Sequence, residues 1–293
     1  AVAPMKVLVT GATGFTGGHL ARHLGRQGHT VAALVRPTSQ HNTETLTREG
    51  VEIRTGDLTD APAVRRACGG IDVVFHIAAT YREAGQSDSA YTRVNVDGTR
   101  HVLEGALAAR ARRVVHCSTG GVHGHIAHPP ANENAPLAPG DVYQRTKLQA
   151  EQLASRFGRE RGLDVVIARP IGIYGPGDMR FLKMFRGIAR GRFPMLGRGE
   201  VFYHLTYIDD LCRGFELCGT VPAAAGRTYI LAGPEYTTVR RVVGLVAQEL
   251  GVKPPWIRLP VWPVWVAGAL CEAICVPLKV DPPLYRRRVD FYR

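Results

Sequence analysis

A tyrosine and a lysine stand four residues apart in the stretch DVYQRTKLQAEQL, as Tyr143 and Lys147. Four residues are about one helical turn, so the two side chains lie on the same face of a helix. A tyrosine hydroxyl has an ordinary pKa of about 10, and a neighbouring cation makes it a usable acid or base near neutral pH. An ordinary amphipathic helix can show the same spacing, so the rest of the chain has to decide.

A glycine-rich turn near the N-terminus suggests the partner of such chemistry. The segment MKVLVTGATGFTGGHLARHLGRQGHTVAALVR predicts a strand at Lys6–Thr10, glycines at 11, 14 and 17, a helix, and a second strand at Val31–Val35. Strand, glycine turn, helix and strand make up the dinucleotide-binding unit. Glycines let backbone N–H groups approach a pyrophosphate at the positive end of the helix. The alternative is a glycine turn without a ligand.

The residue after the second strand distinguishes NAD from NADP. A carboxylate there would hold the ribose 2′-hydroxyl, whereas an arginine favours a 2′-phosphate. The sequence has Arg36 at this point, and its next carboxylate is Glu44. We therefore expect NADP(H) in preference to NAD(H), although an arginine at a strand end can also be merely exposed.

Further strands and helices alternate along the first two-thirds of the chain. Strands are predicted at 51–60, 71–79, 113–124 and 163–178, and helices at 91–107 and from the capping residue Asp141 onward. This alternation predicts an α/β fold with a Rossmann-type, doubly wound parallel sheet. Ligands of such sheets bind beyond the carboxyl ends of the strands. The glycines, Asp57, Ala78, Thr119 and Pro170 all fall at such ends, so we expect them to converge on one crevice.

The composition excludes several classes of partner. The 293 residues include 37 lysines and arginines against 25 aspartates and glutamates, a formal net charge of +12. The positive residues are scattered and no nucleic-acid-binding module is recognisable. A basic surface around one anionic ligand is therefore expected, with no nucleic-acid partner. The length suffices for a full hydrophobic core and one or two structural units.

The cysteines and a histidine run give no indication of a metal site. The six cysteines show neither a CxxC pair nor ligand spacing, which predicts reduced thiols in a cytoplasmic protein. His123, His125 and His128 form an HxHxxH run, but no carboxylate or cysteine accompanies them at ligand spacing. We predict loop histidines and no metal.

Eight motifs carry a resemblance to a known family. TGATGFTG, GDLTD, HIAA, NVDGT, CSTGGVHG, YQRTK, ARPIGIYGPGD and YIDDL run in this order from residue 7 to about residue 211. With them the chain resembles the extended short-chain dehydrogenases/reductases, the group of nucleotide-sugar epimerases and dehydratases, 3β-hydroxysteroid dehydrogenases and dihydroflavonol reductases. The resemblance implies an NAD(P)-binding Rossmann domain over residues 1–171, to which 205–232 return. It further implies a smaller C-terminal substrate-binding region from 172–204 and 233–293, and a homodimer through the helices around 91–110 and 143–158.

The resemblance also implies roles for individual residues. Tyr143 would exchange the proton of the substrate hydroxyl while hydride moves to or from nicotinamide. Lys147 would lower the pKa of Tyr143 and hold the nicotinamide ribose. Thr119 would polarise the substrate oxygen, with Ser118 as the alternative. The implied cofactor contacts are Gly11, Thr13, Gly14, Phe15, Gly17, Arg36, Asp57, Leu58, Ala78, Ala79, Asn95, Tyr143, Lys147 and Pro170, and the implied substrate contacts are Tyr81, Thr119, Gly172, Arg180 and Tyr203.

The substrate side departs from the nucleotide-sugar members. Gly172 and Tyr203 stand where those members usually carry the asparagine and arginine that contact the sugar diphosphate, although Arg180 could substitute. The segment 258–293 is largely apolar, and three tryptophans lie within 256–265. It would wall a hydrophobic pocket or, alternatively, contact a membrane surface peripherally through 258–288, with Arg286, Arg287 and Arg288 near anionic headgroups. Prolines 260, 263 and 277 argue against a membrane span.

Three functions therefore stay open. The leading one is an NAD(P)-dependent oxidoreductase acting on a secondary alcohol or ketone of a mainly apolar, steroid- or flavonoid-like small molecule. The second is a nucleotide-sugar epimerase or dehydratase, although a dehydratase would need an acid pair where Gly120 and Gly121 stand. The third is a non-catalytic nucleotide-sensing protein; relatives of that kind commonly lose the tyrosine or lysine, and both are retained.

Overall fold

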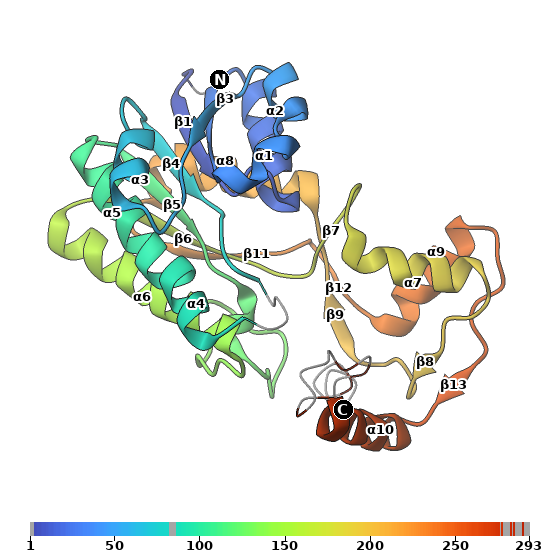
Figure 1. Ribbon diagram of the computed structural model, residues 1–293. Coiled ribbons are helices and arrows are strands. Elements are labelled where there is room, and N and C mark those ends of the chain that lie inside the picture. The colour runs from blue at the N-terminus through green and yellow to red at the C-terminus, as the bar shows by residue number, and fades with distance from the viewer. Residues whose placement is uncertain are drawn as a thin grey trace. The chain divides into compact units, whose positions relative to one another are not determined.

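The chain divides into two compact units. The computed structural model describes residues 3–81 and 86–275 together with Pro277, Pro282, Leu284 and Val289. One unit comprises Ala1–Gly175 and Thr206–Ala232, and the other comprises Pro176–Leu205 and Gly233–Arg293 (Figure 1). The first unit continues past residue 171 because β7 (Ile173–Tyr174) pairs with β10 (Thr206–Tyr207) inside it. The arginines at 286–288, expected near a membrane surface, lie outside the described residues.

A seven-stranded sheet forms the centre of the first unit. Its order is β11-β6-β5-β4-β1-β2-β3, and every neighbouring pair is parallel. From β1 the chain adds β2 and β3 towards one edge of the sheet, and from β4 it adds β5 and β6 towards the other edge. The gap between β1 and β4 is therefore the switch point, where doubly wound sheets bind ligands. The predicted Rossmann-type fold is thereby confirmed. The strands are β1 Lys6–Thr10, β2 Thr30–Val35, β3 Glu52–Thr55, β4 Val73–His76, β5 Arg113–Cys117, β6 Asp164–Pro170 and β11 Thr228–Leu231.

Helices cover both faces of this sheet. On one face, α1 (Phe15–Arg26) and α8 (Ile208–Thr220) pack on the strands; on the other lie α3 (Ala61–Ala67), α5 (Gly98–Ala108) and α6 (Val142–Arg161) (Figure 1). The central strands β4 and β5 are consequently buried along their whole length. The remaining short elements of this unit are η1 Pro37–Asn42, α2 Glu44–Arg48, η3 Gly120–His123 and η4 Pro222–Ala224.

Several elements are shorter than the sequence predicted. The strands expected at 51–60, 71–79 and 113–124 end earlier, at Thr55, His76 and Cys117. Polar turns fixed by Asp57 and Thr119 follow the first and the third of them. The segment 163–178 divides into β6 and β7 at Gly172, whose φ of 47° ends the extended backbone. The helix expected at 91–107 consists of α4 (Asp88–Thr92), a π-helical turn η2 (Arg93–Asp97) and α5.

The second unit has a core of its own. Buried side chains from α7, β8 and α9 form it, among them Ile188, Met195 and Val243. Strand β9 pairs antiparallel with β12, and β8 pairs parallel with β13. Its elements are α7 Met179–Ala189, β8 Met195–Leu196, β9 Phe202–His204, β12 Tyr236–Thr238, α9 Val239–Glu249, β13 Arg258–Leu259 and α10 Val261–Cys275.

Helix α10 contains one of the three prolines that argue against a membrane span. Pro263 does not interrupt it, because it is the third residue of the helix, and the first turn has no intrahelical acceptor for the N–H that proline lacks. The exposed side chains of the helix include Trp262, Leu270 and Ile274. Across the described part of the chain, no helix combines the length and the apolar character needed to span a bilayer.

Candidate active site

The glycine turn after β1 is built for close backbone approach. A Cβ on Gly17 would lie 2.2 Å from the carbonyl oxygen of Gly11, and a Cβ on Gly11 would lie 2.9 Å from the backbone of Ala78. Gly11 also has a φ of +74°, which side-chain-bearing residues rarely adopt. The turn therefore brings the N-terminus of α1, with no acidic residue in its first turn, to the switch point of the sheet. Positive helix ends with open N–H groups suit a pyrophosphate.

The candidate nucleotide contacts follow the ends of β2 and β3. Arg36 is exposed directly after β2. The Asp57 carboxylate accepts hydrogen bonds from the backbone N–H and the hydroxyl of Thr59, at 2.8 and 2.7 Å, which fixes the turn that carries Leu58. The carbonyl oxygen of Leu58 accepts from His101 at 2.7 Å. These hydrogen bonds fix the Asp57–Leu58 turn. Arg36 takes part in none of them and is accessible to solvent.

Asn95 joins the exit of β4 to helix α6. It is buried in the π-helical turn, and its amide oxygen accepts from the backbone N–H of Thr80 at 2.8 Å. Its amide nitrogen donates to the carbonyl oxygen of Thr80 at 3.2 Å and to the hydroxyl of Thr146 at 3.0 Å. Asn95 therefore holds the loop after Ala78 and Ala79 against the helix that carries the tyrosine.

Helix α6 presents Tyr143 and Lys147 on one face. Its N-terminus is fixed by Asp141, whose carboxylate accepts from the backbone N–H of Gln144 at 2.6 Å. Tyr143 is half-buried, and its ring meets that of Tyr81 edge-to-face with 4.9 Å between centroids. Lys147 lies one turn further along and is only 2% exposed. The two residues singled out by their spacing thus lie at the C-terminal edge of the sheet, beside the exits of β4 and β5.

The surroundings of Lys147 are mostly uncharged. Burial lowers the pKa of Lys147, whereas the nearby Cys117 and Glu151 raise it. Burial first and the Lys147 charge second together lower the pKa of His76 to about 3. His116 is shifted in the same direction, again by burial first and by Lys147 second. Both imidazoles are neutral at physiological pH, so neither repels the lysine.

Hydrogen bonds fix the tautomer of His76. Thr99 donates its hydroxyl proton to the carbonyl of Asn95, so towards His76 it can only accept, and His76 Nε2–H donates to it at 3.0 Å. The other ring nitrogen, Nδ1, then accepts from the hydroxyl of Thr10 at 2.9 Å. That hydroxyl oxygen accepts in turn from the backbone N–H of Ala78 at 3.1 Å. A neutral, fully bonded His76 therefore links β1, β4 and α5 below the glycine turn.

Ser118 and Thr119 point to different partners, as expected of successive residues at a strand end. Ser118 is buried and donates its hydroxyl to Glu151 at 2.6 Å. Thr119 is half-buried, and its hydroxyl oxygen accepts from the backbone N–H of Gly121 at 3.1 Å. Within the described residues the Thr119 hydroxyl proton has no acceptor. Of the two hydroxyls, only that of Thr119 can donate to an added oxygen atom.

A buried ion pair anchors the loop behind these hydroxyls. Arg169 binds Glu151 through Nε at 3.1 Å and through Nη2 at 2.5 Å. Its Nη1 donates to His123 Nε2 at 3.1 Å and to the carbonyl of Glu133 at 3.0 Å. His123 donates in turn from Nδ1 to the carbonyl of Pro136 at 3.1 Å. Both ring nitrogens of His123 are thus bonded within the structure, and the described residues contain no cluster of potential metal ligands that includes it.

The candidate substrate contacts are divided between the two units. In the first, Gly172 lies two residues after the end of β6, and its carbonyl accepts from the backbone N–H of Thr206 at 3.1 Å. In the second, Arg180 binds both carboxylate oxygens of Asp178, through Nε at 2.9 Å and Nη2 at 2.8 Å. Tyr203, also in the second unit, lies beside the ring of Phe181 with 6.2 Å between centroids.

Sequence reasoning missed the buried polar residues behind the site. Arg169 interrupts an otherwise apolar strand, and Glu151 lies one helical turn beyond Lys147. A charged residue in a buried strand needs a partner, so Arg169 was a signal that could have been used. His116 gave no comparable signal, because its character follows only from full burial without a partner for either ring nitrogen among the described residues.

The doubly wound sheet with a glycine turn at its switch point defines a dinucleotide-binding protein of the short-chain dehydrogenase/reductase type. The chain belongs to the NAD dependent epimerase/dehydratase family, whose sequence model matches residues 7–232. The predicted family is thus confirmed. The proteins of this type to which the chain is similar are NAD(P)-dependent oxidoreductases, dehydratases and epimerases, so the chain is an enzyme of the extended type.

Comparisons with individual proteins cover most of the chain. It is 34% identical over 294 residues to 2-alkyl-3-oxoalkanoate reductase of Stenotrophomonas maltophilia (strain K279a), covering 96% of this chain and 87% of the relative. It is 32% identical over 267 residues to a dTDP-glucose 4,6-dehydratase of Streptomyces antibioticus, covering 85% and 78%. A short-chain dehydrogenase/reductase superfamily protein from Agrobacterium tumefaciens, solved with bound NAD, is 26% identical with a TM-score of 0.74, covering 87% and 86%.

The neutral histidines below Lys147 predict sensitivity to acid. In the unfolded chain a histidine binds a proton below pH ~6.5, whereas buried His76 and His116 resist protonation until far lower pH. The unfolded state then binds more protons, so the free energy of unfolding falls as the pH drops below ~6.5, by up to about 1.4 kcal/mol per pH unit for each histidine. Above pH ~6.5 both states are neutral and these residues add no slope.

Urea unfolding at pH 7 and pH 5 measures this effect. His116→Leu removes one contribution and two unpaired ring nitrogens, so the variant should lose less stability between the two pH values than the parent protein. His125→Leu, at an exposed position, should lose as much as the parent. An equal loss in the parent and His116→Leu would show that His116 is not a buried neutral group.

Proposed function

We propose that this chain is an NAD(P)-dependent oxidoreductase that transfers a hydride between nicotinamide and a secondary alcohol or ketone carbon of a mainly apolar substrate. The observation that carries the proposal is that Tyr143 and buried Lys147 lie one turn apart on α6, which packs on the η3 turn capped by Thr119. The hydroxyl proton of Thr119 has no acceptor among the described residues. Such a set combines a proton donor, its activating cation and a second hydrogen-bond donor for one oxygen atom.

Each of these residues has a defined task in the reaction. In the reductive direction Tyr143 gives its hydroxyl proton to the substrate oxygen, and in the oxidative direction it removes that proton. The Lys147 cation favours the tyrosinate form and so lowers the pKa of the tyrosine hydroxyl. Thr119 donates a hydrogen bond to the same oxygen as negative charge develops on it. When bound, the cofactor supplies or accepts the hydride.

The residues at the switch point fit a dinucleotide. The close-packed backbone at Gly11 and Gly17 leaves no room for a Cβ, and this geometry suits a pyrophosphate at the N-terminus of α1. The Asp57–Leu58 turn would border the adenine, and Asn95 holds the loop of Ala78 in place. Exposed Arg36 at the end of β2 would bind a 2′-phosphate, which is the basis for proposing NADP(H) over NAD(H).

The candidate substrate contacts favour an apolar molecule over a sugar diphosphate. Asp178 already binds Arg180 through both carboxylate oxygens, so this cation is not an open partner for a diphosphate. The ring of Tyr203 lies beside the ring of Phe181, and Gly172 has no side chain that could bind a phosphate. The similarity to 2-alkyl-3-oxoalkanoate reductase supports a ketone with alkyl substituents. The similarity to dTDP-glucose 4,6-dehydratase keeps nucleotide-sugar chemistry as the second candidate.

A substrate screen distinguishes the two candidates. The full chain is incubated with NADPH or NADH and either alkyl-substituted ketones or UDP- and dTDP-sugars, and absorbance of the reduced nicotinamide is followed. An oxidoreductase consumes reduced cofactor in proportion to ketone, whereas an epimerase converts the sugar without net change in cofactor. Tyr143→Phe should lower kcat by about 10²- to 10⁴-fold, the usual contribution of a general acid. Tyr236→Phe, at an exposed position of the second unit, is the control.

Unchanged turnover in Tyr143→Phe would contradict the proposed chemistry. Binding of cofactor with no turnover of any compound in the screen would favour a nucleotide-sensing role instead.

The two neighbouring hydroxyls can be separated by substitution. Thr119→Val keeps the side-chain shape and removes the donor, so kcat should fall by about 10²- to 10³-fold. Ser118→Ala removes a buried hydrogen bond to Glu151 and should cost stability, about 1–3 kcal/mol, with kcat within about threefold of the parent. Steady-state kinetics and urea unfolding of both variants are measured side by side. A larger loss of kcat in Ser118→Ala than in Thr119→Val would reverse the assignment.

The cofactor preference is tested at Arg36. Arg36→Ala should weaken NADPH binding by about 10- to 100-fold, the value of one hydrogen bond to a charged group, and leave NADH binding within about twofold. Dissociation constants come from quenching of tryptophan fluorescence or from calorimetry. Arg26→Ala, at the C-terminal end of α1, is the matched control. An equal effect of Arg36→Ala on both cofactors would show that the arginine does not recognise the 2′-phosphate.

A further inference from the structure

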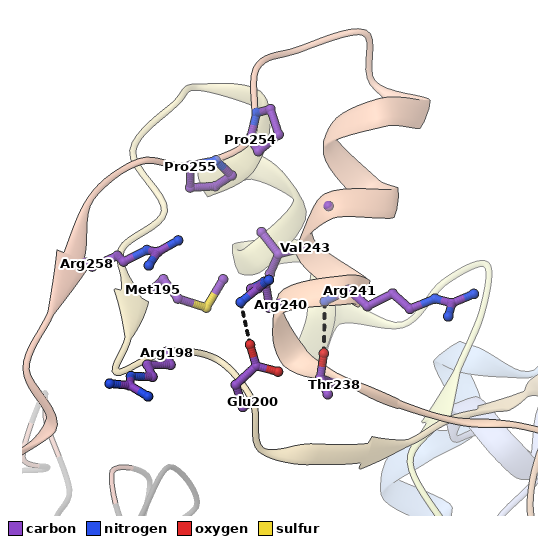
Figure 2. A pocket seen from close by; sticks show the side chains of 11 residues that line it. Met195, Arg198, Glu200, Thr238, Arg240, Arg241, Val243, Pro254, Pro255 and Arg258 are labelled. Atoms are coloured by element: carbon purple, nitrogen blue, oxygen red, sulfur yellow. Dashed lines mark hydrogen bonds and ion pairs between the residues drawn. The ribbon is translucent and has the colours of Figure 1, made fainter.

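The second unit contains a cavity of its own. It has a volume of about 450 Å³ and is lined by residues of β8 and the loop after it, the end of β12, the N-terminal half of α9, the loop at 254–255 and β13 (Figure 2). All of its lining residues belong to the second unit, and none is among the candidate catalytic or cofactor-binding residues. We propose that this cavity binds a small amphiphilic anion, in which a phosphate or carboxylate head is joined to an apolar body.

The lining carries an excess of positive charge. Four of its residues are arginines and one, Glu200, is acidic. Arg240 forms an ion pair with Glu200. Arg198 and Arg258 have no ion-pair or hydrogen-bond partner among the described residues, and the side chain of each is exposed. Guanidinium groups bind phosphate and carboxylate through two parallel hydrogen bonds, so an oxyanion is the ligand that offsets this charge.

The floor of the cavity is apolar. Met195 and Val243 line it and are both buried, and Pro254 and Pro255 form part of its wall. Met195 pairs with Arg258 in the parallel β8–β13 ladder, so these two side chains lie on the same face of the ladder. Figure 2 shows Arg258 and Arg240 on either side of Met195. Cationic and apolar groups therefore alternate within one cavity, which suits a ligand that has both characters.

The size of the cavity favours an organic ligand over an inorganic ion. Small-molecule sites commonly have volumes of about 300–1,000 Å³, and 450 Å³ lies within this range. A bare phosphate would occupy a fraction of that space and would have no apolar part to contact Met195 and Val243. The N-terminus of α9 adds a favourable field for an anion, although its first N–H groups are already bonded to Val201, Gly199 and the Thr238 hydroxyl.

The tryptophans of the chain provide a direct readout of binding. All three lie within 256–265, and Trp256 follows Pro255 of the cavity wall and is 82% exposed. The full chain is titrated with octyl phosphate and octanoate, with inorganic phosphate as the head alone and octyl glucoside as a neutral analogue. Saturable fluorescence changes are expected with the first two, at concentrations at least about tenfold below those needed for inorganic phosphate, and not with octyl glucoside.

Two variants test charge and volume separately. Arg258→Gln should weaken octyl phosphate binding by about tenfold or more, whereas Arg192→Gln, an exposed arginine of the same unit outside the cavity, should not change it. Gly244 lines the cavity, so the larger side chain in Gly244→Leu should occupy its space and abolish binding. A Cβ at this position would meet no atom within 4 Å, so the substitution should not cause a clash. Leucine also favours the helix over glycine, so Tm should not fall.

Several outcomes would overturn the proposal. These are equal binding by Arg258→Gln and Arg192→Gln, unchanged binding by Gly244→Leu, or equal response to octyl glucoside and octyl phosphate. Binding to phosphatidylglycerol vesicles without binding of free octyl phosphate would also overturn it, because the ligand would then be a membrane surface. The fluorescence readout needs no turnover, so the experiment succeeds or fails independently of the catalytic proposal.

Discussion

The burial of one positive charge governs the arrangement of the first unit. Lys147 is 2% exposed at the C-terminal edge of the sheet, where desolvation opposes its charge. A buried cation persists only if its neighbours do not repel it and some of them attract it. His76 and His116 meet the first condition by staying neutral, and Glu151, one turn along α6, meets the second. The charge then remains available to the face of the helix that carries Tyr143.

Glu151 binds two side chains at once, and these bonds hold the loop after β5 in place. Its carboxylate accepts from Ser118 and binds Arg169, which in turn holds His123. Removing one member of a buried ion pair leaves the other charge unpaired, at a cost of about 3–5 kcal/mol. The Ser118 hydroxyl is therefore bonded within the structure, whereas the Thr119 hydroxyl proton has no acceptor among the described residues. This difference between adjacent residues follows from one carboxylate 33 residues further along the chain.

The overall fold could be predicted from sequence because its signals are local. Apolar strands, a glycine turn and helix-like spacing each occupy a few consecutive residues, and together they specify a doubly wound sheet. Strand ends were less predictable: β3 stops at Thr55 because the Asp57 carboxylate caps the turn that follows. The π-helical turn at Arg93–Asp97 left no mark in the apolar pattern, although it carries Asn95. The roles of Glu151 and His116 depend on partners, or missing partners, that only the folded chain reveals.

The two units treat polar groups in different ways, and the difference bears on their roles. In the first unit most buried polar side chains near Lys147 are hydrogen-bonded, as His76, Asn95 and Ser118 show, and His116 is the exception. Such matching rigidifies a site and holds reacting groups in place. In the second unit, Arg198 and Arg258 remain unpaired beside an apolar floor within the described residues. Unpaired cations are tolerated there because they reach solvent, and their free energy falls when an anion arrives. Polar side chains held by hydrogen bonds within the protein suit catalysis. Solvent-exposed arginines without ion-pair partners suit the reversible binding of an anionic ligand.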